Sequence, residues 1–559
     1  MEKKYILFLI PVILYVALLG VMPQMEPDEA RYSLIPSAMN ATGNYVTPHI
    51  KQTIYLEKPP LASWATAVAF KVFGENDFSA RLFAGLCAWG SIVLTFFIGR
   101  RFRDEKTGLY AAAILTISVF PFILGRINIL DMPLTLFLCF AIWLGYLSLV
   151  TESKRYLSYL FYFVCALAFL TKGIIGVVFP FAILVIWLVW AGRWRQIVQL
   201  ISPVGIVIFL IIVCPWIYLA QKENSDFLWF FFVREHFLRF TTQMHGKTEP
   251  FYYFVPIIIG GTLPWSVFLI RAWQQKNWKA CLFQKDENKL LAVWLFFIFL
   301  FYTVSSSKLA TYIAPVFLPI ALFAGNLFRN YEDQWLPLTG KRKTVYSFVL
   351  YTLCAFVVIA LLLPPILKQY SDPARGLVVM TSGRWWIYMI PTLLAAVLMT
   401  FLPDLIARKT RAGWFLTVYL ICCLFLAGMI FPLNDFLSPY RSALVARDAV
   451  ARHVPPGQLL YQYRVNFYGI DFYNKIRTPI VEDFGELADG IQKLPPEERK
   501  QYFLSVDDFF KKVEQEKEIY CITQHRDKLK QLQSKYAGVD MLWDNGAFYL
   551  LRIRSKMKD

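Results

Sequence analysis

The chain has 559 residues and a formal net charge of +18, with 57% hydrophobic and 17% charged residues. A soluble domain carries roughly 45–50% apolar and about 25% charged residues, so water is not the main solvent of this chain. The basic residues are divided among short clusters and form no continuous basic stripe. Nucleic acid is therefore not an expected partner.

Uncharged apolar runs recur along the chain, each near the roughly 20 residues needed to cross about 30 Å of hydrocarbon. The first run follows Lys3 and Lys4, as in a signal peptide, but it is long and no small-residue cleavage site follows it. We therefore expect a retained membrane helix there. In chain order, about thirteen transmembrane helices are predicted, at residues 5–22, 82–100, 107–125, 131–150, 156–172, 174–191, 198–220, 251–270, 289–305, 309–328, 345–367, 385–403 and 413–432.

Two joints in this series are short, because only Lys172 and Gly173 separate one pair of runs and only residues 305–308 separate another. Merging either pair would reverse the orientation of every later helix. Cytoplasmic loops collect Lys and Arg, and with a cytoplasmic amino terminus every loop expected inside is basic. Those basic segments are Lys3-Lys4, Arg100 to Lys106, Lys154-Arg155, Arg193 to Arg195, Arg271 to Lys289, Lys341 to Lys343 and Arg408 to Arg411. The pattern predicts an external carboxyl terminus.

Three stretches are too long to be simple connections, and all are expected outside: residues 23–81, 221–250 and about 435–559. The first two belong to a predicted membrane domain of residues 1–434. The third alternates short strand-like runs with charged helical patterns, which favours a small external α/β domain at 435–559. The strand-like runs are 459–461, 519–522 and 548–553, and the helical patterns are 506–517 and 525–535. A packing or substrate-gating role is expected for this domain.

The first external stretch concentrates charge beside the membrane, in residues 26–32 and again in residues 55–60. Charged groups at the edge of hydrocarbon are costly unless paired or solvated, which makes them candidates for function. A solvated loop with internal salt bridges is the alternative. A third segment, residues 126–133, places Asp131 at the external mouth of the fourth helix. Helix capping by Asp131, with Pro133 in the first turn, is an equally good interpretation.

These strings resemble the multi-pass GT-C glycosyltransferases, specifically the aminoarabinose transferase (ArnT-like) branch related to protein O-mannosyltransferases. The segments that carry the resemblance are PDEARYSLIP at 27–36, YLEKPPL at 55–61, GENDFSARL at 74–82, INILDMP at 127–133, LTKG at 170–173 and REHFLRF at 234–240. The resemblance covers roughly the first 240 residues. It implies an all-α polytopic membrane domain of GT-C type, followed by the small C-terminal α/β domain.

The resemblance also implies the substrates and the location. The donor would be a sugar on undecaprenyl phosphate, and the reaction would move 4-amino-4-deoxy-L-arabinose to a lipid A phosphate at the periplasmic face of a bacterial inner membrane. Membrane lipids would surround the protein. No nucleotide is needed, which agrees with a sequence that has no glycine-rich phosphate loop.

One departure leaves the sugar and the acceptor open. Arg126 stands where a histidine is expected before the Ile-Asn pair in many close relatives. Protein Ser/Thr or another envelope glycan therefore remains an alternative acceptor. A lipid-linked sugar transporter is the alternative from another class, although transporters favour sites near the midplane whereas these acids gather in an external loop.

The residues can be given roles from the chemistry and from family positions. Breaking a sugar–phosphate bond builds negative charge on the departing lipid phosphate, which cations must meet. The resemblance suggests Arg31 and Lys58 for that phosphate, with Lys172 as a weaker third. Asp28 is the expected catalytic carboxylate, which would orient the acceptor, take its proton or steady positive charge on the sugar. Glu29 and Asp131 are supporting catalytic candidates.

Further substrate-binding candidates come from the same segments, and they are Tyr32, Tyr55, Glu57, Asn128, His236 and Arg239. His236 and Arg239 would share one face of a helix, although a structural histidine is an equal alternative. The sequence specifies no cofactor, and a divalent metal stays open as an alternative. Asp28 and Glu57 offer the hard oxygen ligands that a divalent metal prefers, but no rigid ligand spacing specifies a metal site.

Overall fold

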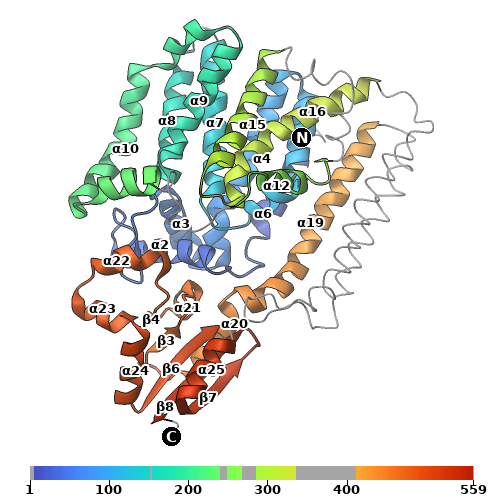
Figure 1. Ribbon diagram of the computed structural model, residues 1–559. Coiled ribbons are helices and arrows are strands. Elements are labelled where there is room, and N and C mark those ends of the chain that lie inside the picture. Colours follow the sequence, from blue (N-terminus) through green and yellow to red (C-terminus); the bar gives the residue numbers. More distant parts are fainter. Residues whose placement is uncertain are drawn as a thin grey trace.

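The computed structural model describes residues 6–151, 154–238, 249–266, 285–334, 411–524 and 526–557. Figure 1 shows a bundle of helices above a C-terminal domain built on a sheet, with α2 (Asp28–Thr42) and α3 (Leu61–Phe73) lying between the two. The first half of the chain also contains α1 (Ile6–Val12), η2 (Ile13–Ala17), β1 (His49–Ile50), β2 (Thr53–Ile54), α4 (Asp77–Phe102), α5 (Glu105–Ile117), α6 (Val119–Leu124), α7 (Asp131–Val150), α8 (Tyr156–Lys172), α9 (Ile175–Trp190), η3 (Trp194–Leu200) and α10 (Pro203–Glu223).

The bundle continues with further helices after α10. They are η4 (Trp229–Leu238), α12 (Phe254–Gly261), α15 (Asp286–Val304), η5 (Ala310–Val316), α16 (Phe317–Gln334) and α19 (Arg411–Arg441). Five helical stretches in the described ranges are long and apolar enough to cross a membrane, namely Asp77–Phe102, Asp131–Val150, Pro203–Glu223, Asp286–Val304 and Ala310–Asn330. Shorter apolar helices, including α8 and α9, pack among them. The predicted spans at 345–367 and 385–403 lie outside the described residues.

Both short joints of the predicted topology are breaks between separate helices. The first break follows Lys172, where Gly173 has φ 82° and donates its N–H to the carbonyl of Phe169 at 2.7 Å. That left-handed conformation suits glycine, which ends α8 and lets α9 begin two residues later. The second break lies between Val304 at the end of α15 and Ala310 at the start of η5.

Three predicted spans are less regular than expected. The run at 107–125 is divided into α5 and α6 at Ser118, which has extended backbone angles, because Pro121 cannot donate the hydrogen bond that would continue the helix. The run at 5–22 contains Pro11 and changes from α-helix to the π-helix η2. Within its described part, the run at 251–270 is α-helical over α12 and is interrupted by turns directly after it.

The C-terminal domain contains a six-stranded sheet in the order β5-β4-β3-β6-β8-β7. Strands β3, β4, β5 and β6 pair in parallel, whereas β8 pairs antiparallel with both β6 and β7. Its elements are α20 (Leu444–His453), β3 (Leu460–Tyr463), α21 (Tyr468–Asn474), β4 (Ile480–Val481), η7 (Gly485–Leu487), α22 (Ala488–Gln492), α23 (Pro496–Tyr502), β5 (Phe503–Leu504), α24 (Val506–Gln515), β6 (Glu518–Gln524), α25 (Arg526–Lys535), β7 (Tyr536–Asp544) and β8 (Phe548–Met557). Three strands and two helices therefore match the predicted runs, while β4, β5 and β7 were not predicted.

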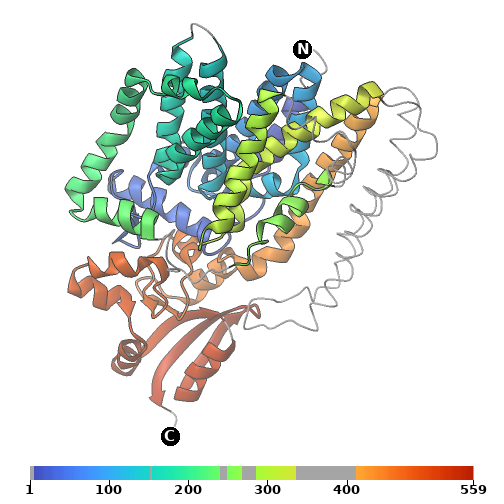
Figure 2. The same cartoon turned by 45° about the horizontal axis from the view of Figure 1, so that its top comes forward.

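The C-terminal domain and the first external stretch share a hydrophobic core. Ile35 and Met39 of α2 and Ile50 of the β1–β2 hairpin are buried in one cluster with Tyr468 and Leu487 of the domain. Figure 2 shows the same relation from another side, with the blue helices of the external stretch between the bundle and the orange and red domain. The segment that carries the predicted site is therefore held from both sides.

Candidate active site

Asp28 and Arg31 lie one turn apart at the start of α2, where the helix N-terminus favours a carboxylate. They form an ion pair of 2.6 Å, in which the Asp28 side chain is 60% exposed while that of Arg31 is 9% exposed. The Arg31 guanidinium also lies 5.1 Å from the ring centre of Tyr32 and 5.8 Å from that of Tyr55. Asp28 therefore presents an accessible carboxylate beside a buried, fixed cation.

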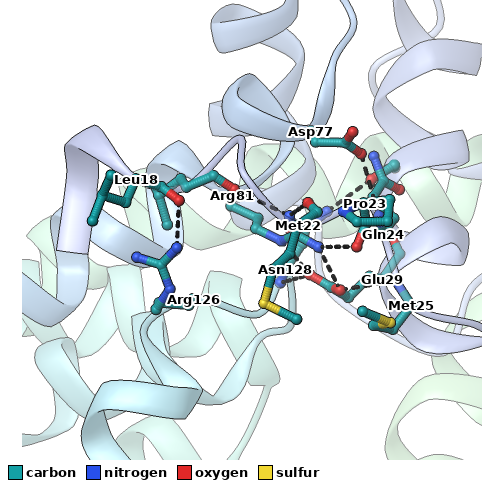
Figure 3. A network of polar contacts seen from close by, with 12 residues as sticks. Leu18, Met22, Pro23, Gln24, Met25, Glu29, Asp77, Arg81, Arg126 and Asn128 are labelled. Atoms are coloured by element: carbon teal, nitrogen blue, oxygen red, sulfur yellow. Dashed lines mark hydrogen bonds and ion pairs between the residues drawn. The ribbon is translucent and has the colours of Figure 1, made fainter. Parts of the chain in front are cut away.

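Glu29 points the other way, into a buried network that Figure 3 shows. Its two oxygens accept hydrogen bonds of 2.7 Å each from Arg81, of 2.9 Å from the backbone N–H of Asn128 and of 2.9 Å from that of Met25. A carboxylate offers about four acceptor positions, so this one is fully used. Glu29 ties α2 to α4 and to the segment before α7, which favours a positioning role over the catalytic role expected from the sequence.

Asn128 belongs to the same network. Its side-chain amide donates to the Ser33 hydroxyl at 3.0 Å, and its side chain is buried. The backbone N–H and the side-chain NH₂ of Asn128 are thus both hydrogen-bonded to protein groups.

Asp131 begins α7 and pairs with Lys172 at the end of α8, with 2.5 Å between the carboxylate and Nζ. The Lys172 ammonium also lies 4.4 Å from the ring centre of Tyr312. The N-cap of α7 is Leu130, and it makes no side-chain cap hydrogen bond. The ion pair, rather than helix capping, therefore accounts for Asp131.

Lys58 lies between two buried carboxylates. Its Nζ is 3.5 Å from an oxygen of Glu57 and 3.5 Å from an oxygen of Glu235 on η4. The Tyr55 hydroxyl is 3.4 Å from Glu57 and 3.0 Å from Glu486 of the C-terminal domain. Burial raises the pKa of Tyr55, which keeps this hydroxyl protonated, so that it can donate its one hydrogen to either acid, with Glu486 at the shorter distance.

A cavity of about 390 Å³ brings the two lysines together. Its polar lining includes Glu57, Lys58, Lys172 and Glu235. The rest of the lining is mainly apolar and aromatic, with two serines, and consists of Ile174, Ile175, Val178, Phe179, Phe232, Phe301, Tyr302, Ser305, Ser307 and Tyr312. Both helix breaks described above contribute to this lining, so the irregular backbone at Gly173 and at residues 305–309 is used to build the cavity.

The structure thus brings together most of the residues predicted from the sequence, in two adjoining groups. One lies around Tyr55 and includes Asp28 and Arg31, and the other lies around Glu57 and includes Lys58. The side chain of His236 and the whole of Arg239 lie outside the described residues. Sequence reasoning did not single out Glu235, Arg81 or Glu486. The first two stand inside REHFLRF and GENDFSARL, two of the strings that carry the family resemblance, whereas nothing in the sequence around Glu486 points to the site.

Arg126, the departure noted in the sequence, is a buried residue between α6 and α7 that contacts the end of the first helical segment. Its guanidinium donates to the carbonyl oxygen of Leu14 at 2.6 Å and to that of Leu18, and Figure 3 shows it directed toward Leu18. Arg126 therefore adds hydrogen bonds to carbonyl groups near the end of the first helical segment. In the described residues, no three His, Cys, Asp or Glu side chains gather as metal ligands.

Comparison with known proteins gives consistent matches. A family model for dolichyl-phosphate-mannose-protein mannosyltransferases matches residues 57–219. The undecaprenyl phosphate-α-4-amino-4-deoxy-L-arabinose arabinosyl transferase of Pseudomonas paraeruginosa is 30% identical over 67% of this chain and 71% of its own length. The corresponding transferase 2 of Pseudomonas fluorescens is 31% identical over 54% of this chain. That alignment spans about half of the relative's length, 55%.

The fold is also similar to that of a solved structure. The crystal structure of ArnT from Cupriavidus metallidurans bound to undecaprenyl phosphate superimposes with a TM-score of 0.81 and 23% identity, covering 98% of this chain and 97% of that one. At that identity the likeness establishes the polytopic GT-C membrane fold. With the apolar helices, it makes this chain an integral membrane protein.

Proposed function

This chain belongs to the undecaprenyl phosphate-α-4-amino-4-deoxy-L-arabinose arabinosyl transferase family, and we propose that it moves this amino sugar from undecaprenyl phosphate to a lipid A phosphate. The observation that carries the proposal is the cavity that joins Lys58 and Lys172 to an apolar wall. A lipid phosphate needs both features, because its headgroup is anionic and its prenyl chain is apolar. The names of the relatives, which specify this donor, support the assignment.

We propose that Lys58 and Lys172 bind the donor phosphate and that Arg31 adds a third cation. As the bond between the sugar carbon and the phosphate oxygen breaks, negative charge grows on the lipid phosphate, and ammonium groups placed in advance stabilise that charge. The paired acids Glu57, Glu235 and Asp131 hold these ammonium groups within 3.5 Å of a carboxylate until the phosphate arrives.

Asp28 is the proposed catalytic carboxylate because it is the accessible acid of the first helical turn. An acceptor phosphate is already an anion near neutral pH and needs little help from a base. The main task of Asp28 is then to orient the acceptor and to steady the positive charge that develops on the sugar. Tyr32, Tyr55 and Glu57 are proposed substrate contacts around it.

We further propose the finer topology, with about thirteen spans as the length of the apolar runs allows. The site, residues 221–250 and the C-terminal domain would face the periplasm of a bacterial inner membrane. The membrane domain would extend to about residue 434, and residues 435–559 would form the external domain.

The test uses Asp28→Asn and Lys58→Ala in the full chain. Each variant should lose at least about a hundredfold in transfer of radiolabelled aminoarabinose from undecaprenyl phosphate to lipid A, as removal of one group that stabilises transition-state charge costs elsewhere. The wild type should give a covalent product in detergent, whereas a transporter would need sealed vesicles. Turnover like that of the wild type in both variants, at equal protein levels, would contradict the assignment.

A further inference from the structure

The C-terminal domain holds the segment that leads into α2. The backbone N–H of Glu26 donates to the carbonyl of Arg441 at 2.7 Å. The buried carboxylate of Glu26 accepts hydrogen bonds from the backbone N–H groups of Tyr468 at 3.1 Å and Gly469 at 2.6 Å. Since Asp28 follows two residues later, the position of the proposed catalytic carboxylate depends on the C-terminal domain.

The domain also holds the segment that leads to Tyr55. Lys51 of the β1–β2 turn forms a buried ion pair of 2.6 Å with Asp471, and its ammonium donates to the Thr478 hydroxyl at 2.7 Å. A pair of this kind, removed from water and completed by a hydroxyl, fixes the turn against the domain. The segment that leads into α2 and the segment that leads to Tyr55 are therefore both held by the C-terminal domain.

One contact of the domain reaches the site itself. The Glu486 carboxylate accepts hydrogen bonds from Arg31 and, at 3.0 Å, from the Tyr55 hydroxyl. Arg31 is thus held by Glu486 on one terminal nitrogen, by Asp28 at 2.6 Å on the other, and by the ring of Tyr55. A guanidinium is a rigid planar donor, so partners on two of its nitrogens and on its face leave it one orientation.

We propose that Glu486 is a positioning residue of the transferase site, through which the C-terminal domain holds the Arg31 guanidinium beside Asp28. The inference rests on the proposed function, since it takes Arg31 as a phosphate ligand. Without the Glu486 charge, Asp28 is the one acidic ion-pair partner left to Arg31 among the described residues, and Arg31 turns toward it. Both the cation and the carboxylate then leave the arrangement that transfer needs.

Ion pairs elsewhere on the same interface allow positioning by Glu486 to be distinguished from simple adhesion between the two parts of the chain. Other ion pairs across the same interface, such as Lys475 with Glu75 and Lys493 with Asp226 at 2.7 Å, touch no proposed catalytic or phosphate-binding residue. Glu75→Gln is therefore a matched control for Glu486→Gln, because it removes one carboxylate charge from the same interface at a distance from the chemistry.

The experiment compares both variants in the full-length protein. Glu486→Gln should lower kcat about tenfold or more, as expected for the loss of one hydrogen bond to a charged group, while the melting temperature stays that of the wild type. The kcat of Glu75→Gln should stay within about twofold of the wild-type kcat. Glu486→Asp, which keeps the charge on a shorter side chain, should recover part of the loss.

A double-mutant cycle separates positioning from a general structural effect. If Glu486 acts through Arg31, Glu486→Gln should change turnover by less than about twofold in an Arg31→Ala background. Turnover like that of the wild type in Glu486→Gln, an equal loss in Glu75→Gln, or an undiminished loss in the Arg31→Ala background would each overturn the inference. If the wild type transfers no sugar, the proposed reaction fails. In that case the inference is tested by the dissociation constant of undecaprenyl phosphate. Glu486→Gln should change this constant when Arg31 is present and should leave it unchanged in the Arg31→Ala background.

Discussion

Adjacent acids at the start of α2 serve opposite purposes. The Asp28 side chain is 60% exposed beside Arg31, whereas that of Glu29 is 3% exposed and fully engaged by Arg81. A helix places consecutive residues about 100° apart, so one side chain faces the site while the next faces the bundle. The sequence predicts both acids as catalytic candidates because the string alone does not say which face is buried.

This difference predicts opposite outcomes for two isosteric substitutions. Glu29→Gln removes the counter-charge of the buried Arg81 and should destabilise the protein by about 3–5 kcal/mol. We expect a lower melting temperature and less folded protein in detergent, with activity per folded molecule retained. Asp28→Asn should instead leave the melting temperature and the amount of folded protein unchanged while activity per folded molecule is lost. A Glu29→Gln variant that is as stable as the wild type but inactive would place Glu29 in the chemistry instead.

At the scale of elements, the apolar runs predict most helices but not their interruptions. Runs such as 131–150 are helical over their whole length, because nothing in them breaks the hydrogen-bond pattern. The division at Ser118 follows from Pro121, which was visible in the sequence but is often tolerated in membrane helices. Close helix crossings also escape prediction, since they depend on which glycines face a neighbour.

Helices α4 and α5 provide such a crossing, where Gly99 faces Gly108. A Cβ atom on Gly108 would lie 2.5 Å from the carbonyl oxygen of Phe96, so the two backbones could not keep their approach. Gly108→Ala should therefore destabilise the protein by about 1–3 kcal/mol. The matched control is Gly260→Ala in α12, where an added Cβ meets nothing within 4 Å.

The measurement for this pair is the fraction of protein that remains monodisperse in detergent after heating. Gly260→Ala should leave the melting temperature unchanged or raise it slightly, because alanine favours helix by up to about 1 kcal/mol. Equal melting temperatures for the two variants would mean that α4 and α5 can separate without cost, contrary to the close packing described here.

At the scale of the whole molecule, two cavities support the predicted topology. Lys172 and Ser305, from the two short joints, line the same cavity as Lys58 of the external stretch. Arg103 and Lys285, both predicted to be cytoplasmic, line a second cavity together. Two loops predicted to be cytoplasmic thus lie close together, as they would if both faced the same side of the membrane. The contact of Glu486 with Tyr55 could not be predicted, because 431 residues separate them and no local pattern links them.

The proposed orientation rests on the number of spans before each loop, and it can be tested with alkaline phosphatase fusions, which are active only outside the cytoplasm. Fusions after Asn224 and after the last residue, Asp559, should be active, whereas fusions after Arg103 and after Arg195 should be inactive. If the helices on either side of Gly173 were one span, the fusion after Arg195 would be active instead. The distinction matters for the site, since Lys58, Lys172 and the C-terminal domain reach the same lipid-linked donor only if all of them lie on one face of the membrane.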